Sequence, residues 1–231
     1  MSKADDLDKH LAGLFDAERR VRELHDRISD GDADAVLDAI GRALEKAMKE
    51  PDEAEASLRL ERLAALLGEQ EGPRAVDLLI DILASDIPEA REAAGTQLEG
   101  LAYDRFKEVA KGIERGLKRL PLGSPALPEM PYILAEVPEP GVMKLLELFM
   151  AHEDPDAVAA AIEVAVTLGD PTIVKHIERL TGDKRTVEMT DENEEAAEVT
   201  IGELAEDALG LFEEGGDEDE ESPPQPKKQK H

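Results

Sequence analysis

Apolar residues recur at helical spacing from the start of the chain. Across residues 5–28 and then 33–49 they fall three, four or seven positions apart, which is the spacing of one helix face. The residues concerned are Leu7, Leu11, Leu14, Val21, Leu24 and Ile28 in the first segment, and Val36, Leu37, Ile40, Leu44 and Met48 in the second. Residues 29–32 separate the segments, Asp32 is placed to cap the second, and Pro51 ends it.

These two segments predict a helical hairpin over residues 1–50. The hairpin is either a terminal cap on the helices after residue 50 or a coiled-coil seam. Glu18 and His25 interrupt the apolar seam, which favours the cap.

A longer period begins at residue 51. Helix-breaking positions stand at Gly68, Gly100, Val137 and Gly169, spaced by 32, 37 and 32 residues. A second helix is predicted after each break, at 73–84, 104–120, 140–152 and 171–180. A helix pair of this size cannot bury its apolar stripe alone, so neighbouring pairs stack and share one core. The pattern therefore predicts an array of helix pairs over residues 51–212.

One unit of this array has a distinctive sequence. Asp154-Pro155-Asp156-Ala157-Val158, closed by Leu168-Gly169-Asp170-Pro171, resembles the HEAT-like repeat, in particular the short bacterial type of the phycobilisome lyases. The resemblance covers roughly residues 52–212 and is close only for 154–183. It implies an all-α fold, an alpha-alpha superhelix (HEAT-like solenoid), whose second helices line a concave binding surface. Ile162 and Leu168 fall on the apolar stripe of this unit and are predicted to be buried.

The remaining units depart from that pattern. Five prolines crowd the first helix of the third unit, which must be short: Pro125, Pro128, Pro131, Pro138 and Pro140. The last unit is predicted to have an extended stretch at 186–189 and a helix at 201–212. Residues 213–231, acidic first and basic at the tip, are predicted to be a disordered tail.

Composition narrows the function classes. The 231 residues are 41% apolar but only 3% aromatic, so the core must be Leu, Ala, Ile and Val, and sheet is not expected. The net charge of −28 disfavours nucleic acid and anionic lipid surfaces and suits basic or polar protein partners. With no Cys, disulfides, thiol catalysis and Cys-based zinc sites are excluded. The polar start of the chain and the absence of a long apolar stretch predict no membrane insertion and a cytoplasmic location.

Candidate catalytic chemistry is sparse. His152-Glu153 is a single His-Glu pair at a helix end, too few ligands for an iron site, so no metal and no cofactor is predicted. No phosphate-binding glycine loop and no nucleophile elbow occurs. The resemblance to phycobilisome lyases leaves one enzyme alternative open, a lyase-like or protein-modifying enzyme acting on a bound protein partner.

Basic residues on the predicted second helices form the candidate binding site. Those on 104–120 share one helix face beside the apolar stripe, and those on 171–180 flank a similar stripe. The residues are Lys107, Lys111, Arg115 and Lys118, followed by Lys175, His176 and Arg179. They predict a concave basic strip for an acidic peptide or protein loop. The simpler interpretation, which the abundance of nearby Glu and Asp favours, is salt-bridge balance. The predicted function is a non-enzymatic protein–protein interaction scaffold or adaptor of bacterial type.

Overall fold

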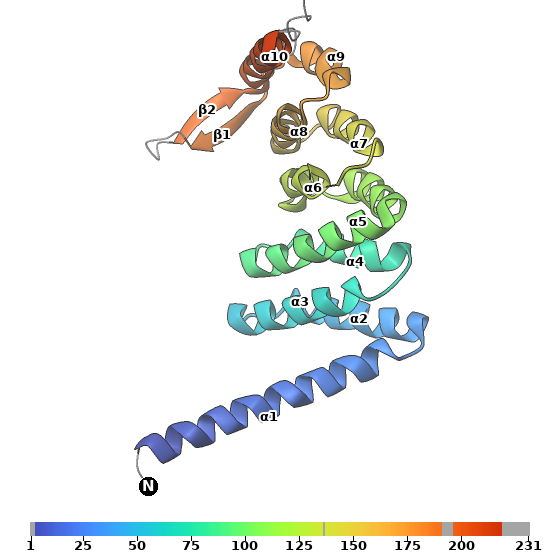
Figure 1. Cartoon of the computed structure of the whole chain (residues 1–231), viewed down its shortest axis with the longest axis vertical. Coiled ribbons are helices and arrows are strands. Elements are labelled where there is room, and N and C mark those ends of the chain that lie inside the picture. The colour runs from blue at the N-terminus through green and yellow to red at the C-terminus, as the bar shows by residue number, and fades with distance from the viewer. Residues whose placement is uncertain (1–2, 136, 191–195, 219–231) are drawn as a thin grey trace, which may run out of the picture. The chain divides into compact units, whose positions relative to one another are not determined.

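The computed structural model describes residues 3–135, 137–190 and 196–218, and most of these residues are helical (Figure 1). The helices are α1 (Lys3–Ser29), α2 (Ala33–Ala47), α3 (Glu53–Gly68), α4 (Pro73–Leu83), α5 (Pro88–Arg119), α6 (Ala126–Ala135), α7 (Gly141–Met150), α8 (Pro155–Leu168), α9 (Val174–Ile177) and α10 (Ile201–Glu218). Short 3-10 turns, Pro171–Ile173 and Glu178–Leu180, flank α9. The predicted all-α helical-repeat fold is confirmed, and no helix in the described parts is long and apolar enough to cross a membrane.

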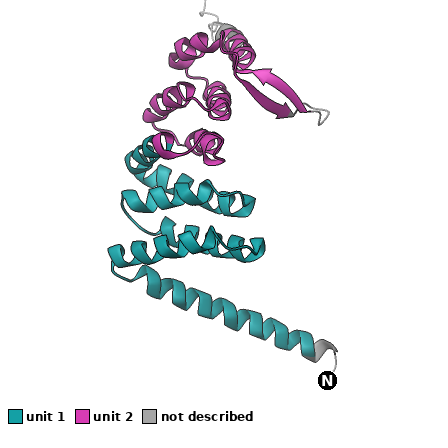
Figure 2. Ribbon diagram, turned by 180° about the vertical axis from the view of Figure 1, so that it is seen from behind, with its two compact units in different colours: residues 1–116 teal, residues 117–231 magenta. Residues whose placement is uncertain are grey.

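The chain forms two compact units, residues 1–116 and 117–231 (Figure 2). In the first unit α2, α3 and α4 pack on one another. Asp32 and Asp52 start α2 and α3, because each carboxylate accepts a hydrogen bond from a backbone N–H three residues on, at 3.1 Å. Leu60, Leu67, Leu79 and Ile80 are fully buried between these helices.

Helix α1 meets this unit only near its C-terminal end. His25 Nε2 lies 2.8 Å from Glu69 Oε1, and Ser29 Oγ donates to Glu69 Oε2 at 2.5 Å. The bond from Ser29, followed by that from His25, lowers the pKa of Glu69 despite partial burial. Towards its N-terminus the helix diverges from α3 (Figure 1). Its apolar stripe is therefore uncovered, with Leu7 exposed by 63% and Leu14 by 55%.

The predicted helix break at Gly100 is wrong. The helix continues through Gly100 and is interrupted at Arg105, where φ is −134° and ψ is 47°. Arg105 Nη2 donates to the Gln70 carbonyl oxygen at 3.0 Å, which fixes the kink against the turn before α4. The predicted second helix, 104–120, corresponds to the stretch after the kink.

In the second unit α6 and α7 both pack on α8. Asp154 starts α8: its Oδ1 accepts from Ala157 N at 3.0 Å and its Oδ2 from Gly123 N at 2.6 Å. Gly169 ends α8 at the predicted break, in the left-handed conformation with φ 64°. Ile162 is buried as expected, but Leu168 is 36% exposed. The prediction for Leu168 is wrong because the last turn of α8 is covered less than the rest of the helix, with Thr167 exposed as well.

A β-hairpin and α10 complete this unit. The extended stretch predicted at 186–189 is strand β1 (Thr186–Thr190), which pairs antiparallel with β2 (Ala196–Thr200), Val187 opposite Val199. The expectation of no sheet is wrong at this one place. Helix α10 buries Ala205 and Ala208 and continues to Glu218, beyond the predicted end at 212. The rest of the predicted tail, 219–231, lies outside the described residues.

Candidate functional site

The predicted basic residues of the first unit differ in their partners. Lys107 and Lys111 are exposed, beside the buried Val109 and Ile113. Arg115 turns towards α4, where its Nη2 lies 2.8 Å from Asp77 Oδ1 and donates to the Pro73 carbonyl at 3.2 Å. Arg115 thus joins α5 to α4, as the salt-bridge interpretation of the strip expects.

The predicted basic residues of the second unit also differ in their exposure and in their partners. Lys118, Lys175 and Arg179 are exposed. His176 is half-buried, and its Nε2 faces Glu147 Oε2 at 3.7 Å. The second unit therefore presents three solvent-facing cations at the predicted positions, while the fourth faces a carboxylate on α7.

Cations also gather where the sequence did not single them out. A hollow of about 460 Å³ at the end of α2 is lined by Arg42, Lys46, Lys49 and Arg59, with Glu45, Glu50 and Pro51. Arg59 is already paired with Glu50 at 2.9 Å and Glu55 at 2.8 Å. The hollow is open and mixed in charge.

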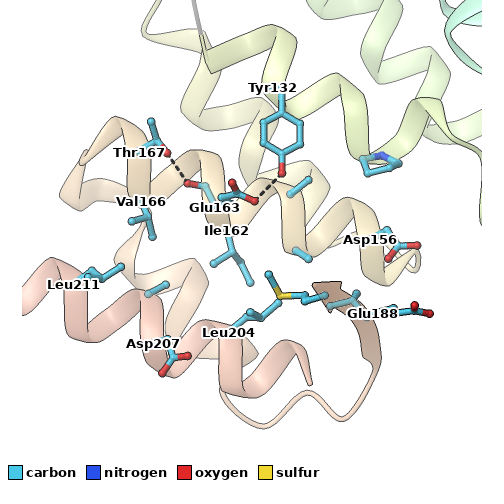
Figure 3. A pocket seen from close by; sticks show the side chains of 16 residues that line it. Tyr132, Asp156, Ile162, Glu163, Val166, Thr167, Glu188, Leu204, Asp207 and Leu211 are labelled. Atoms are coloured by element: carbon cyan, nitrogen blue, oxygen red, sulfur yellow. Dashed lines mark hydrogen bonds between the residues drawn. The ribbon is translucent and has the colours of Figure 1, made fainter. Parts of the chain in front are cut away.

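The second unit contains an apolar groove about 490 Å³ in volume. It lies among α6, α8, β1 and α10 (Figure 3). Its lining comprises Pro128, Tyr132, Asp156, Ala159, Ala160, Ile162, Glu163, Val166, Thr167, Val187, Glu188, Met189, Leu204, Asp207, Ala208 and Leu211. We name the concavity that these residues line the α8–α10 groove. None of its lining residues is Lys, Arg or His.

The floor of the α8–α10 groove is made of side chains that the helical pattern places in the core. Ile162 and Leu204 point towards each other at its centre (Figure 3). Two large apolar side chains complete the floor at its open side, Met189, 41% exposed, and Leu211, 55% exposed. Met189 shares one face of β1 with the buried Val187, and Leu211 follows the buried Ala208 by one helical turn, yet both stay exposed. The packing of this unit therefore leaves their apolar surface uncovered.

The rim carries four exposed carboxylates: Asp156, Glu163, Glu188 and Asp207. Glu163 accepts a hydrogen bond from the Tyr132 hydroxyl at 2.7 Å. Partial burial, together with this carboxylate, raises the pKa of Tyr132 far above its ordinary value. Partial burial and the neighbouring Asp154 also raise the pKa of Asp156. Within the described structure none of the four rim carboxylates forms an ion pair, so their negative charge is uncompensated.

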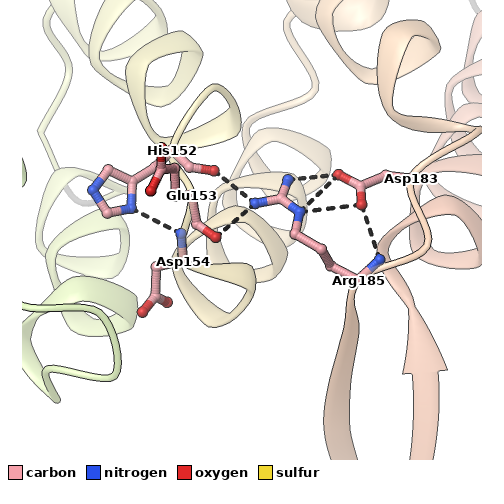
Figure 4. A network of polar contacts seen from close by, with 5 residues as sticks. All are labelled: His152, Glu153, Asp154, Asp183 and Arg185. Carbon is pink, nitrogen blue, oxygen red and sulfur yellow. Dashed lines mark hydrogen bonds and ion pairs between the residues drawn. The ribbon is translucent and has the colours of Figure 1, made fainter.

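An arginine fixes the walls of the groove relative to one another (Figure 4). Arg185 Nη1 donates to the carbonyl oxygens of His152 and Glu153 at 2.8 and 2.9 Å, and Nε donates to both carboxylate oxygens of Asp183 at 3.0 to 3.1 Å. This pairing lowers the pKa of Asp183 and raises that of Arg185. Arg185 precedes β1 and spans to the turn before α8, so it ties these two walls together. No pattern in the sequence indicates this role.

His152, of the His152-Glu153 pair, has a structural role, because its ring forms hydrogen bonds to the backbone. His152 Nε2 donates to the Leu117 carbonyl at 3.1 Å, while Nδ1 accepts from the Asp154 backbone N–H at 3.1 Å. Both ring nitrogens are thus used in holding the α7–α8 turn. Among the residues that the structure describes, no group of three or more His, Asp or Glu side chains is arranged to hold a metal ion.

Comparisons with known proteins identify no family for this chain. No protein-family model matches the chain, and no curated protein matches it. An engineered protein of known crystal structure aligns at 15% identity over 86% of this chain and 93% of its own, with a TM-score of 0.36. A second engineered protein aligns at 20% identity over 84% and 89%, with a TM-score of 0.33. At such scores neither alignment bears on the function.

Proposed function

We propose that this chain is a protein-binding module of the scaffold or adaptor type, which holds a segment of a partner protein in the α8–α10 groove. The observation that carries the proposal is an apolar floor with two large exposed side chains, Met189 and Leu211, inside a concavity of about 490 Å³. Concave, mostly apolar surfaces with a few polar groups at the edge are where proteins bind ligands. Membership of the HEAT-like family and a cytoplasmic location remain part of this proposal.

Two features make the groove suited to a protein segment. Its walls come from helices and a strand whose own side chains are packed, and Arg185 holds two of them together through its bonds to the carbonyl oxygens of His152 and Glu153. A surface held in place in this way loses little conformational freedom on binding. The rim is polar and the centre apolar, which is the usual anatomy of a protein interface.

The enzyme alternative, a lyase-like or protein-modifying activity on a bound protein, would use the same groove to hold its substrate. No reactive group in the groove favours it over binding alone. Tyr132, the only lining side chain with a phenol, has a raised pKa, so its hydroxyl stays protonated near neutral pH and is a poor nucleophile there.

A displayed library of random peptides, selected against the full chain, tests the binding function. We expect enriched peptides to bind the unmodified chain and to lose at least tenfold in affinity for Leu211→Ser. The matched control is Leu148→Ser, because Leu148 is 46% exposed in the same unit but does not line the groove. Enrichment that is equally affected by both substitutions, or no enrichment, contradicts the proposal.

The same selection tests the predicted acidic partner of the basic strip. If that strip binds, acidic peptides are enriched and their affinity falls for Lys175→Glu. Lys175 is exposed on α9 and is not part of the groove. Acidic peptides that depend on Lys175 and not on Leu211 would assign binding to the strip.

A further inference from the structure

We infer that the occupant of the α8–α10 groove is a cationic amphipathic segment of a partner protein, with apolar side chains on the floor and lysine or arginine side chains at the rim. This inference rests on the proposed binding function and names the chemistry of the partner. It concerns the second unit only.

The negative charge of the rim favours a partner segment with positive charge. Asp156 and Glu163 stand on α8, Glu188 on β1 and Asp207 on α10, so carboxylates border the groove from three elements. Since no lining residue is basic and none of these four carboxylates has an ion-pair partner in the described structure, the chain leaves their charge for a ligand to balance. An acidic segment would be repelled there, and charge complementarity of this kind sets which partners are excluded.

The apolar floor of the groove favours a partner segment that also carries large apolar side chains. Met189 and Leu211 are exposed by 41% and 55%, next to the buried Ile162 and Val187. Covering these two side chains removes apolar surface from water, which is the main favourable contribution in most protein associations. A purely charged segment would leave that surface wet, so a segment with both lysines and large apolar side chains fits best.

The effect of the rim is separable from the overall charge of the chain. Asp207 lines the groove, whereas the adjacent Glu206 lines a different hollow, with Thr181, Gly202 and Glu203. Both carboxylates are exposed. Replacing either by lysine changes the net charge equally, but only one replacement changes the rim.

Fluorescence anisotropy with two synthetic peptides provides the test. The probe is a labelled 16-residue peptide with leucines three and four positions apart and lysines elsewhere, and its counterpart has glutamate in place of every lysine. We expect the lysine peptide to bind the full chain and the glutamate peptide not to bind. Asp207→Lys should weaken the lysine peptide at least tenfold, while Glu206→Lys should change its affinity less than threefold.

The outcomes separate the inference from the function on which it rests. Equal weakening by Asp207→Lys and Glu206→Lys, or binding of the glutamate peptide, overturns the cationic partner. If the selected library peptides depend on Leu211 for binding but are neutral or acidic, the cationic partner is also overturned. The proposed binding function would still hold in that case.

Two further measurements exclude occupants from the chain itself. Residues 219–231 include Lys227, Lys228 and Lys230. If the lysine peptide binds only after removal of 219–231, the groove belongs to the chain's own C-terminal segment and the inference is wrong. If its binding weakens as the protein concentration rises, the groove is occupied by a second copy, which also overturns it.

Discussion

Helix α1 leaves Leu7, Leu11 and Leu14 exposed by half or more, whereas α8 buries residues on nearly every face, among them Val158, Ile162 and Val164. Both helices carry regular apolar positions in the sequence. The difference lies in the neighbours: α8 has α6, α7, α10 and β1 around it, whereas α1 touches α2 and α3 only near its end. Periodicity therefore determines that a helix forms and which face is apolar, and the number of packed neighbours determines how much that face stabilises the fold.

The two helices also differ in how they are terminated. Asp154 and Gly169 hold α8 at its two ends, by two hydrogen bonds and by a left-handed turn respectively. In α1 a glycine, Gly13, stands in the middle of the helix with no atom near the position of a side chain. In an exposed helix interior glycine is unfavourable, so α1 is weaker both in packing and in local propensity.

The largest effect that separates the two helices is the loss of a buried side chain. Ile162→Ala in α8 should lower the free energy of unfolding by about 2–5 kcal/mol, because Ile162 is 3% exposed and its removal leaves a cavity. Leu11→Ala in α1 should change it by less than about 0.5 kcal/mol, because Leu11 is 50% exposed. Urea denaturation followed by circular dichroism measures both. Similar losses for the two variants would mean that the stripe of α1 is covered in solution.

Starts and ends of helices depend mostly on local chemistry and were predictable for this reason. The cap by Asp32, the stop at Gly169 and the short α6 all depend on residues adjacent in sequence. The predicted break at Gly100 was wrong, because an isolated glycine does not break a helix, and the interruption at Arg105 depends on a hydrogen bond to Gln70, far away in sequence.

The candidate site was less predictable than the fold. The basic residues Lys107, Lys175 and Arg179 are exposed as expected, but Arg115 and His176 face carboxylates on neighbouring helices. The α8–α10 groove is assembled from four elements that are distant in sequence, so no spacing predicts it. Met189 and Leu211 gave no signal either, because Met189 shares a strand face with the buried Val187 and Leu211 follows the buried Ala208 by one helical turn.

A second, smaller difference concerns the caps. Asp154→Ala should cost about 2–3 kcal/mol, because it removes the cap of α8 and leaves the Gly123 N–H without its acceptor at 2.6 Å. Asp52→Ala, which removes only the cap of α3, should cost about 1 kcal/mol. Asp154→Asn keeps one side-chain acceptor and should fall between the two. Equal costs for Asp154→Ala and Asp52→Ala, measured by urea denaturation, would show that the bond to Gly123 adds nothing.

The smallest effect is expected at the glycines, and there the two helices should respond with opposite signs. Gly169→Ala puts a side chain on a residue at φ 64°, which should destabilise the second unit by about 1 kcal/mol. Gly13→Ala meets nothing within 4 Å and should stabilise α1 by about 0.5–1 kcal/mol. Because the N-terminal half of α1 has few contacts with the rest of its unit, this gain should be local rather than global. Amide hydrogen exchange is the suitable measurement: residues around position 13 should exchange about two to five times more slowly in Gly13→Ala, with no change in α8. A slower exchange that extends to α2 and α3 would mean that α1 folds together with its unit, and the contrast drawn between the two helices would then be wrong.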